Sequence, residues 1–116
     1  MDEQLKEIIR KITKFRDERD WVQFHDPKNL AEAISVEAGE LLENFLWLNI
    51  EQAYKLDEKK VGKIKEEMAD IFIFILYLCD VLKIDLLAET EKKIAINAEK
   101  YSVAKAKGTA KKYTEL

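Results

Sequence analysis

Two pairs of acidic residues stand three positions apart in segments of helical character: Glu37 with Glu40, and Glu67 with Asp70. Residues three apart lie about 60° from each other around an α-helix, so each pair can direct both carboxylates toward one point. If the two helices pack side by side, four carboxylates share a small volume, and their repulsion favours a bound cation. Because all the ligands would be oxygens, the expected ion is Mg²⁺ or Mn²⁺.

Acidic pairs at this spacing are also common on solvated helix faces, so their surroundings decide the interpretation. Residues 33–42 around the first pair contain no cation, and the second pair runs directly into the most apolar segment of the chain, residues 71–79. Acids at the edge of a core are hard to explain as a solvated face. A di-iron carboxylate bundle would need Glu-x-x-His on two helices, and the only histidine, His25, precedes the second predicted helix.

The elements that carry these acids are predicted to be helical throughout, which makes the fold all-α and similar to a four-helix bundle. Only three glycines and one proline interrupt the chain, and apolar residues recur mostly at helical spacing. This pattern predicts long helices at residues 3–19, 29–48, 57–82 and 86–106. We expect one domain over residues 1–106, followed by a short, less ordered polar tail at residues 107–116.

The helix ends follow from capping residues. Asn29, with Glu32 three positions later, is expected to cap the second helix, and Asp85 is expected to cap the fourth. The third helix is expected to start near Asp57 or Glu58. Residues 71–79 would also suit a strand, but the absence of a helix breaker and the need for the acids to converge favour a helix.

Composition excludes several classes of protein. The 20 Lys and Arg against 23 Asp and Glu give a formal charge of -3, so no broad basic face for a nucleic acid polymer is expected. The single cysteine, Cys79, fits a reducing cytoplasm, and we expect it to be buried. No signal peptide and no membrane span are expected, because the longest apolar run is nine residues. Since the helix at 57–82 is apolar on several faces, we expect a homo-oligomer, a dimer or a tetramer.

Several segments together resemble the all-α nucleoside triphosphate pyrophosphohydrolases of the MazG-like superfamily, and within it the dCTP pyrophosphatase type. They are the two acidic pairs separated by 26 residues, the aromatic loop at 19–30, residues 40–47, and the pattern Lys93-x3-Asn97-x2-Lys100-Tyr101. The resemblance covers residues 10–103, with Ser102 in place of a usual proline.

This resemblance implies hydrolysis of a nucleoside triphosphate to its monophosphate and pyrophosphate, with a role in clearing unwanted nucleotides. It implies that Mg²⁺ is held by Glu37, Glu40, Glu67 and Asp70, with Glu40 as the general base. It also implies that one face of the last helix contacts the phosphates, through Lys93, Asn97, Lys100 and Tyr101.

Loop aromatics are the candidates for a nucleobase slot, because aromatic faces stack on bases. The resemblance favours base contact for Trp21 and Trp47, whereas Phe24 is expected to pack in the core. His25 could hydrogen-bond a base edge or satisfy a loop carbonyl. Members associated with dCTP tend to have a histidine where this chain has Ile12, which leaves the cytosine preference open.

Two other functions remain open at this point. One is a non-catalytic helical oligomer that binds nucleotide or a partner protein. The other keeps the fold and changes the substrate to dUTP or phosphoribosyl-ATP. Intact acids at all four positions favour an enzyme, and the aromatic loop with Trp47 favours the dCTP-like branch.

Overall fold

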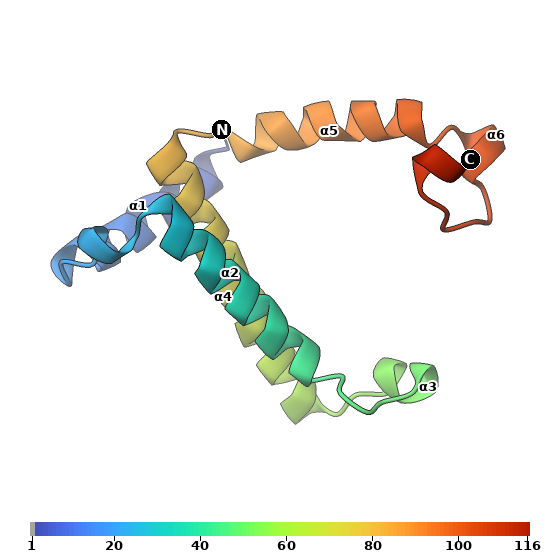
Figure 1. Ribbon diagram of the computed structural model, residues 1–116. Coiled ribbons are helices and arrows are strands. Elements are labelled where there is room, and N and C mark those ends of the chain that lie inside the picture. The colour runs from blue at the N-terminus through green and yellow to red at the C-terminus, as the bar shows by residue number, and fades with distance from the viewer. Residues whose placement is uncertain (1) are drawn as a thin grey trace. The chain divides into compact units, whose positions relative to one another are not determined.

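The computed structural model describes residues 2–116 and confirms the all-α fold, with no strand among those residues (Figure 1). The helices are α1 Glu3–Glu18, α2 Pro27–Glu43, α3 Ile50–Tyr54, α4 Glu58–Leu82, α5 Leu86–Lys100 and α6 Val103–Ala106. Short 3-10 helices cover Val22–Phe24 and Tyr113–Glu115. None of the described helices is both long and apolar enough to cross a membrane. The chain forms two compact units, Asp2–Lys83 and Ile84–Leu116.

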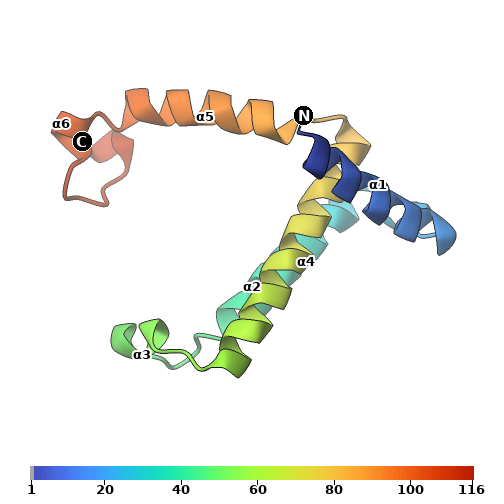
Figure 2. The same ribbon diagram turned by 180° about the vertical axis from the view of Figure 1, so that it is seen from behind.

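In the first unit, α2 and α4 run antiparallel along each other, and α1 packs against the C-terminal half of α4 (Figures 1 and 2). The core sits at this junction, where Leu30 of α2 and Leu76 of α4 are 1% and 0% exposed. Burial of each such leucine contributes about 1.5–3 kcal/mol to stability. Residues 71–79 lie within α4, so the helical prediction for this segment is confirmed, and Cys79 is buried as expected.

Two polar contacts join α1 to α4 beside this core. The Tyr77 hydroxyl donates a hydrogen bond to the backbone carbonyl of Ile12 at 2.6 Å. One turn along α1, the Arg16 guanidinium pairs with the Asp80 carboxylate at 3.1 Å, and the Arg16 side chain is only 12% exposed. Because both contacts are partly shielded from water, they fix how α1 lies on α4 more firmly than surface ion pairs would.

The start of α2 differs from the prediction. Asp26, not Asn29, is the N-cap, and its carboxylate accepts a hydrogen bond from the Asn29 backbone N–H at 2.9 Å. Pro27 explains the difference, because its fixed φ and missing N–H suit the first helical position, so the helix with its cap begins three residues earlier. Asn29 instead donates a hydrogen bond from its side-chain amide to the backbone carbonyl of Phe24. Phe24 is 58% exposed and is not packed in the core, contrary to expectation.

Two other helix boundaries also differ. α2 ends at Glu43 instead of continuing to Leu48, and turns follow, with Trp47 at a left-handed φ of 68°. α3 was not expected, although Asn49 and Gln52 form the reciprocal capping box that starts it. The cap at Asp85 is confirmed, and α4 starts at Glu58, within the predicted start near Asp57 or Glu58, with Asp57 as its N-cap.

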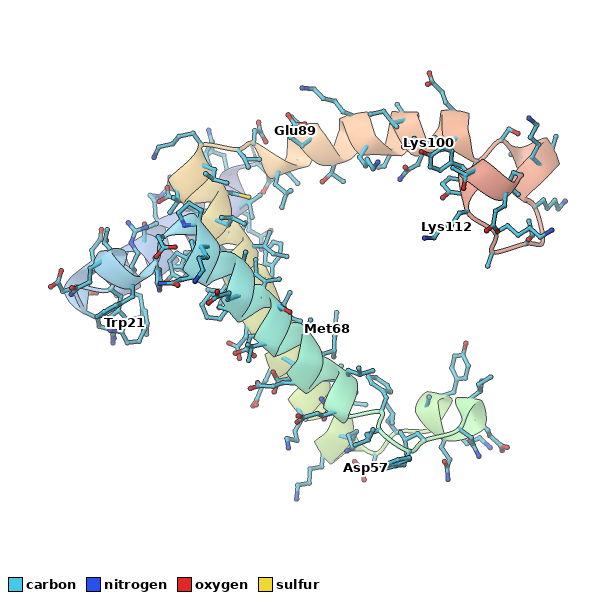
Figure 3. The ribbon with its side chains drawn as sticks, viewed as in Figure 1. Trp21, Asp57, Met68, Glu89, Lys100 and Lys112 are labelled. Carbon is cyan, nitrogen blue, oxygen red and sulfur yellow. The ribbon has the colours of Figure 1, made fainter. Side chains whose placement is uncertain are left out.

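The second unit contains α5, α6 and the C-terminal residues. α5 ends at Lys100, earlier than predicted, because Tyr101 leaves the helical conformation and Ser102 begins α6. Tyr113 packs beside the end of α5: its ring lies 6.1 Å from the Tyr101 ring and 4.5 Å from the Lys100 ammonium nitrogen. Figure 3 labels Lys100 at this contact. The tail therefore makes specific aromatic contacts within this unit.

Candidate metal and nucleotide site

Three of the predicted acids converge where α2 and α4 run along each other. Glu37 from α2 and Glu67 and Asp70 from α4 each offer one carboxylate oxygen, and these oxygens all lie within 4.8 Å of one another. Asp70 is solvent-exposed, whereas Glu37 and Glu67 are half-buried. The antiparallel packing of α2 on α4 brings the two i, i+3 pairs to the same level, as the spacing predicted.

The electrostatics of this cluster suit a divalent cation. The Oε2 atoms of Glu37 and Glu67 are buried, and neither has a hydrogen-bond partner within residues 2–116. The pKa of Glu37 is raised to about 7, first by burial, then by the adjacent carboxyl groups of Glu67 and Glu40, and also by the charge of Asp70. Buried acceptors without a partner are costly, and an oxygen-only donor set matches the preference of hard cations. The residues present therefore fit a divalent metal.

Glu40 lies outside this three-carboxylate group. Its side chain is exposed and lines a neighbouring polar cavity of about 310 Å³. The structure thus brings the carboxylate oxygens of three of the four predicted acids within 4.8 Å of one another, and Glu40 lies beside Glu37 at the edge of that group.

On the other side of Asp70 lies a larger, mainly apolar cavity of about 420 Å³, between α1, the aromatic loop and α4. Two of the predicted base-contact residues, Trp21 and His25, line it, and Figure 3 marks Trp21 in the loop after α1. The full lining is Lys11, Ile12, Phe15, Trp21, His25, Asp70, Ile73, Phe74 and Tyr77. Because Asp70 belongs both to this cavity and to the carboxylate cluster, the two are contiguous.

His25 presents an unused polar atom in this aromatic wall. Its ring centre lies 4.6 Å from that of Tyr77 and 6.4 Å from that of Trp21. Its Nδ1 is buried, and the described residues provide no partner for it. Burial, and secondarily the positive charge of Arg16, lowers the pKa of His25, which favours the neutral ring. A neutral imidazole can donate from one nitrogen and accept at the other, so His25 can bind a polar base edge.

Trp47 is not part of this cavity. It follows the C-terminal end of α2, whereas His25 precedes its N-terminal end, and the 17 residues of α2 span about 25 Å. The Trp47 side chain is 91% exposed. Within one chain, Trp47 and the Trp21–His25 pair therefore cannot contact the same base.

The predicted phosphate face lies in the second unit. Lys93 and Asn97 are exposed on α5, while Lys100 and Tyr101 contact Tyr113. All four therefore belong to Ile84–Leu116, and the carboxylates belong to Asp2–Lys83.

Sequence reasoning missed Phe74 and Tyr77, which line the apolar cavity. Both follow Asp70 on α4, at i+4 and i+7, and so share its face of the helix. This spacing was the available signal, but it was hidden because residues 71–79 are apolar in every direction. Lys60 and Lys63, which line the polar cavity with Glu40, were missed as well.

Comparisons with known proteins identify the family and the fold. A model of the MazG-like family matches residues 33–116. dCTP pyrophosphatase 1 of Bos taurus is 38% identical over 116 residues, covering 97% of this chain and 68% of the relative, and the Homo sapiens protein of the same name is 35% identical, covering 97% and 67%. The crystal structure of a pyrophosphatase from Archaeoglobus fulgidus superposes with a TM-score of 0.83 at 37% identity, covering 88% of this chain and 95% of that one. The chain belongs to the MazG-like family, as its motifs predicted.

Proposed function

We propose that this protein is a nucleoside triphosphate pyrophosphohydrolase, which converts a nucleoside triphosphate and water into the monophosphate and pyrophosphate. One observation carries the proposal: a carboxylate cluster with unpaired buried oxygens adjoins an aromatic cavity through the shared residue Asp70. The cluster suits the phosphate-bound cation, and the cavity suits a base. Family membership and the dCTP pyrophosphatase relatives support the same activity.

Glu37, Glu67 and Asp70 would hold Mg²⁺, with Mn²⁺ as the alternative ion. When bound, the ion neutralises phosphate oxygens and lowers the pKa of the attacking water. The motif also suggests Glu40 as a ligand, but its position outside the cluster favours proton transfer. Its carboxylate would accept the proton of the water as the new phosphorus–oxygen bond forms and the anhydride bond between the α- and β-phosphates breaks.

The aromatic cavity would hold the base, with Trp21 stacking and His25 at its polar edge. Of the candidate bases, cytosine comes first because the relatives are dCTP pyrophosphatases. Ile12 lines the cavity and brings no hydrogen-bonding side chain, so we expect weaker discrimination against other bases than a polar residue would provide.

We further propose that the enzyme works as a cytoplasmic homo-oligomer. Val36, Leu42 and Met68 are 58–68% exposed on α2 and α4, and Figure 3 labels Met68 there. Such apolar surface favours contact with a second copy. Trp47, if it stacks on a base, would do so in the cavity of a partner subunit. Lys93, Asn97, Lys100 and Tyr101 would supply the remaining donors to phosphate.

A turnover screen tests the function. The eight common ribo- and deoxyribonucleoside triphosphates are incubated with enzyme and Mg²⁺, and pyrophosphate and orthophosphate are quantified separately. We expect pyrophosphate with the monophosphate, best with a pyrimidine deoxynucleotide, and no release in EDTA. Inorganic pyrophosphate is included as a substrate, since one relative is described only as a pyrophosphatase. Nucleotide binding without turnover would contradict the enzyme proposal.

A further inference from the structure

We propose that Lys60 and Lys63 form a subsite for the two terminal phosphates of the substrate, which leave as pyrophosphate. This inference rests on the proposed function and adds a direction to it: the substrate lies along α4, with its base toward Tyr77 and its terminal phosphate toward Lys60. Neither lysine belongs to the phosphate motif that the family resemblance placed on α5.

The subsite is the polar cavity of about 310 Å³ on the far side of the carboxylates from the base cavity. Its lining is Glu40, Glu43 and Asn44 from α2, and Lys60, Lys63 and Glu67 from α4. Glu67 belongs both to this cavity and to the carboxylate cluster, just as Asp70 belongs to the cluster and to the base cavity. The base cavity, the metal cluster and the lysine cavity therefore form a continuous series.

The spacing on α4 explains this series. Lys60, Lys63, Glu67, Asp70, Phe74 and Tyr77 follow one another at alternating intervals of three and four residues. Side chains at these intervals form one stripe along a helix. At 1.5 Å per residue, Asp70 and Lys63 are separated by about 10 Å along the axis. If the α-phosphate lies beside the carboxylates, this distance suits the β- and γ-phosphates, because a lysine side chain can also reach along the helix surface.

The two ammonium groups are free to take an anionic ligand. Lys28, Lys55 and Lys92 each pair with a glutamate on their own helix. Neither Lys60 nor Lys63 has an ion pair within 4.0 Å in residues 2–116, although Glu67 stands at i+4 from Lys63. Within the same residues Lys59 and Lys65 are unpaired as well, so what distinguishes Lys60 and Lys63 is that they line the cavity that contains Glu67. Lys60 is also half-buried. Phosphate oxygens would supply the missing partners through charge-assisted hydrogen bonds.

The direct test is calorimetric titration of inorganic pyrophosphate with excess Mg²⁺. The variant is the double substitution Lys60→Gln with Lys63→Gln. Its matched control is Lys59→Gln with Lys65→Gln, which removes the same charge from the same helix outside this cavity. We expect the double variant to bind pyrophosphate at least about tenfold more weakly than wild type, and the control to stay within about twofold.

A second measurement separates this subsite from the metal and the base cavity. In the same variant, the inhibition constant of the nucleoside monophosphate product should change less than about twofold, and the Mg²⁺-induced rise in melting temperature should be kept. Unchanged pyrophosphate binding, or equal weakening of pyrophosphate and monophosphate, would overturn the proposal, as would a wild type that binds no pyrophosphate. If the double variant fails to fold, Lys63→Gln alone, at an exposed side chain, gives the same test. Failure of the proposed function would instead appear as absent triphosphate turnover in wild type, which the calorimetry does not require.

Discussion

Glu37 and Glu67 face each other across the contact between α2 and α4, each with one buried carboxyl oxygen that no described residue binds. Two acids held in this way raise the free energy of the folded chain unless a proton or a cation offsets their desolvation and repulsion. The raised pKa of Glu37, about 7, reflects this cost. The folded protein therefore carries a binding site that metal or a proton can stabilise.

The pH dependence of stability follows from Glu37. Its pKa of about 7 in the folded state exceeds the ordinary value of 4.5, so the fold binds this proton more tightly than the unfolded chain does. The contribution is fully present below about pH 4.5 and is lost as pH rises through 7. In EDTA, the melting temperature of wild type minus that of Glu37→Gln should become more negative between pH 5 and pH 8. A difference that does not change with pH would contradict the raised pKa of Glu37.

Tyr77→Phe tests the link between α1 and α4. The substitution leaves the Ile12 carbonyl without its donor at 2.6 Å, so we expect a loss of about 1 kcal/mol. The melting temperature should fall by several degrees, measured by circular dichroism. Tyr54→Phe is the control, because the Tyr54 side chain is 87% exposed. Equal effects of the two substitutions would show that the buried hydroxyl contributes no special stability.

Glu40→Gln separates proton transfer from metal binding. Loss of a general base should lower kcat by about 10² to 10⁴, with KM changed little. Since Glu40 lies outside the three-carboxylate cluster, the Mg²⁺-induced rise in melting temperature should be largely kept. Glu66→Gln, at an exposed side chain on α4 outside both the cluster and this cavity, is the control. A lost Mg²⁺ response with the same fall in kcat would instead make Glu40 a ligand.

Trp47 can be tested by complementation. Trp47→Ala should raise KM by roughly tenfold, the equivalent of about 1 to 3 kcal/mol of stacking. If Trp47 acts in a partner's cavity, the two variant proteins Trp47→Ala and Asp70→Asn can be mixed, unfolded and refolded together. The mixed oligomers should then regain turnover with a KM close to that of wild type. One site in such an oligomer has Asp70 from one subunit and Trp47 from the other. No recovery, with mixed oligomers shown by mass spectrometry, would remove Trp47 from the base site.

The helices were predictable where local chemistry determined them. Asp85 caps α5 as expected, and α4 starts at Glu58, where a start near Asp57 or Glu58 was expected. The predicted cap of α2 was wrong. Asn29 and Glu32 resemble a capping box, but Pro27 makes the earlier start more favourable. α3 was missed since five residues carry too little periodicity to stand out.

For the site, helical spacing places Glu67 and Asp70 on one face of α4, and the expected side-by-side packing of α2 on α4 brings Glu37 to them. The separation of Trp47 from Trp21 was not predictable in the same way, because it depends on where α2 ends and on the turns that follow. Lys60 and Lys63 looked like ordinary surface lysines in the sequence. Only the packing of α2 on α4 shows that they share a cavity with Glu67.

In the proposed enzyme, Glu37, Glu67 and Asp70 hold the divalent ion on which hydrolysis depends. The most direct measurement is the melting temperature with and without Mg²⁺, alongside pyrophosphate release, for wild type, Asp70→Asn and Glu66→Gln. Glu66 is exposed on α4 beside Glu67 and lies outside the cluster, so it controls for the charge change.

Wild type and Glu66→Gln should gain stability with Mg²⁺ by mass action and hydrolyse the substrate at similar rates. Asp70→Asn in metal-free buffer should be as stable as wild type or more stable, because it relieves repulsion, but it should gain less from Mg²⁺. Its kcat should fall by roughly 10² or more. If Asp70→Asn instead keeps near wild-type turnover and the full Mg²⁺ response, the carboxylate cluster is not the metal site.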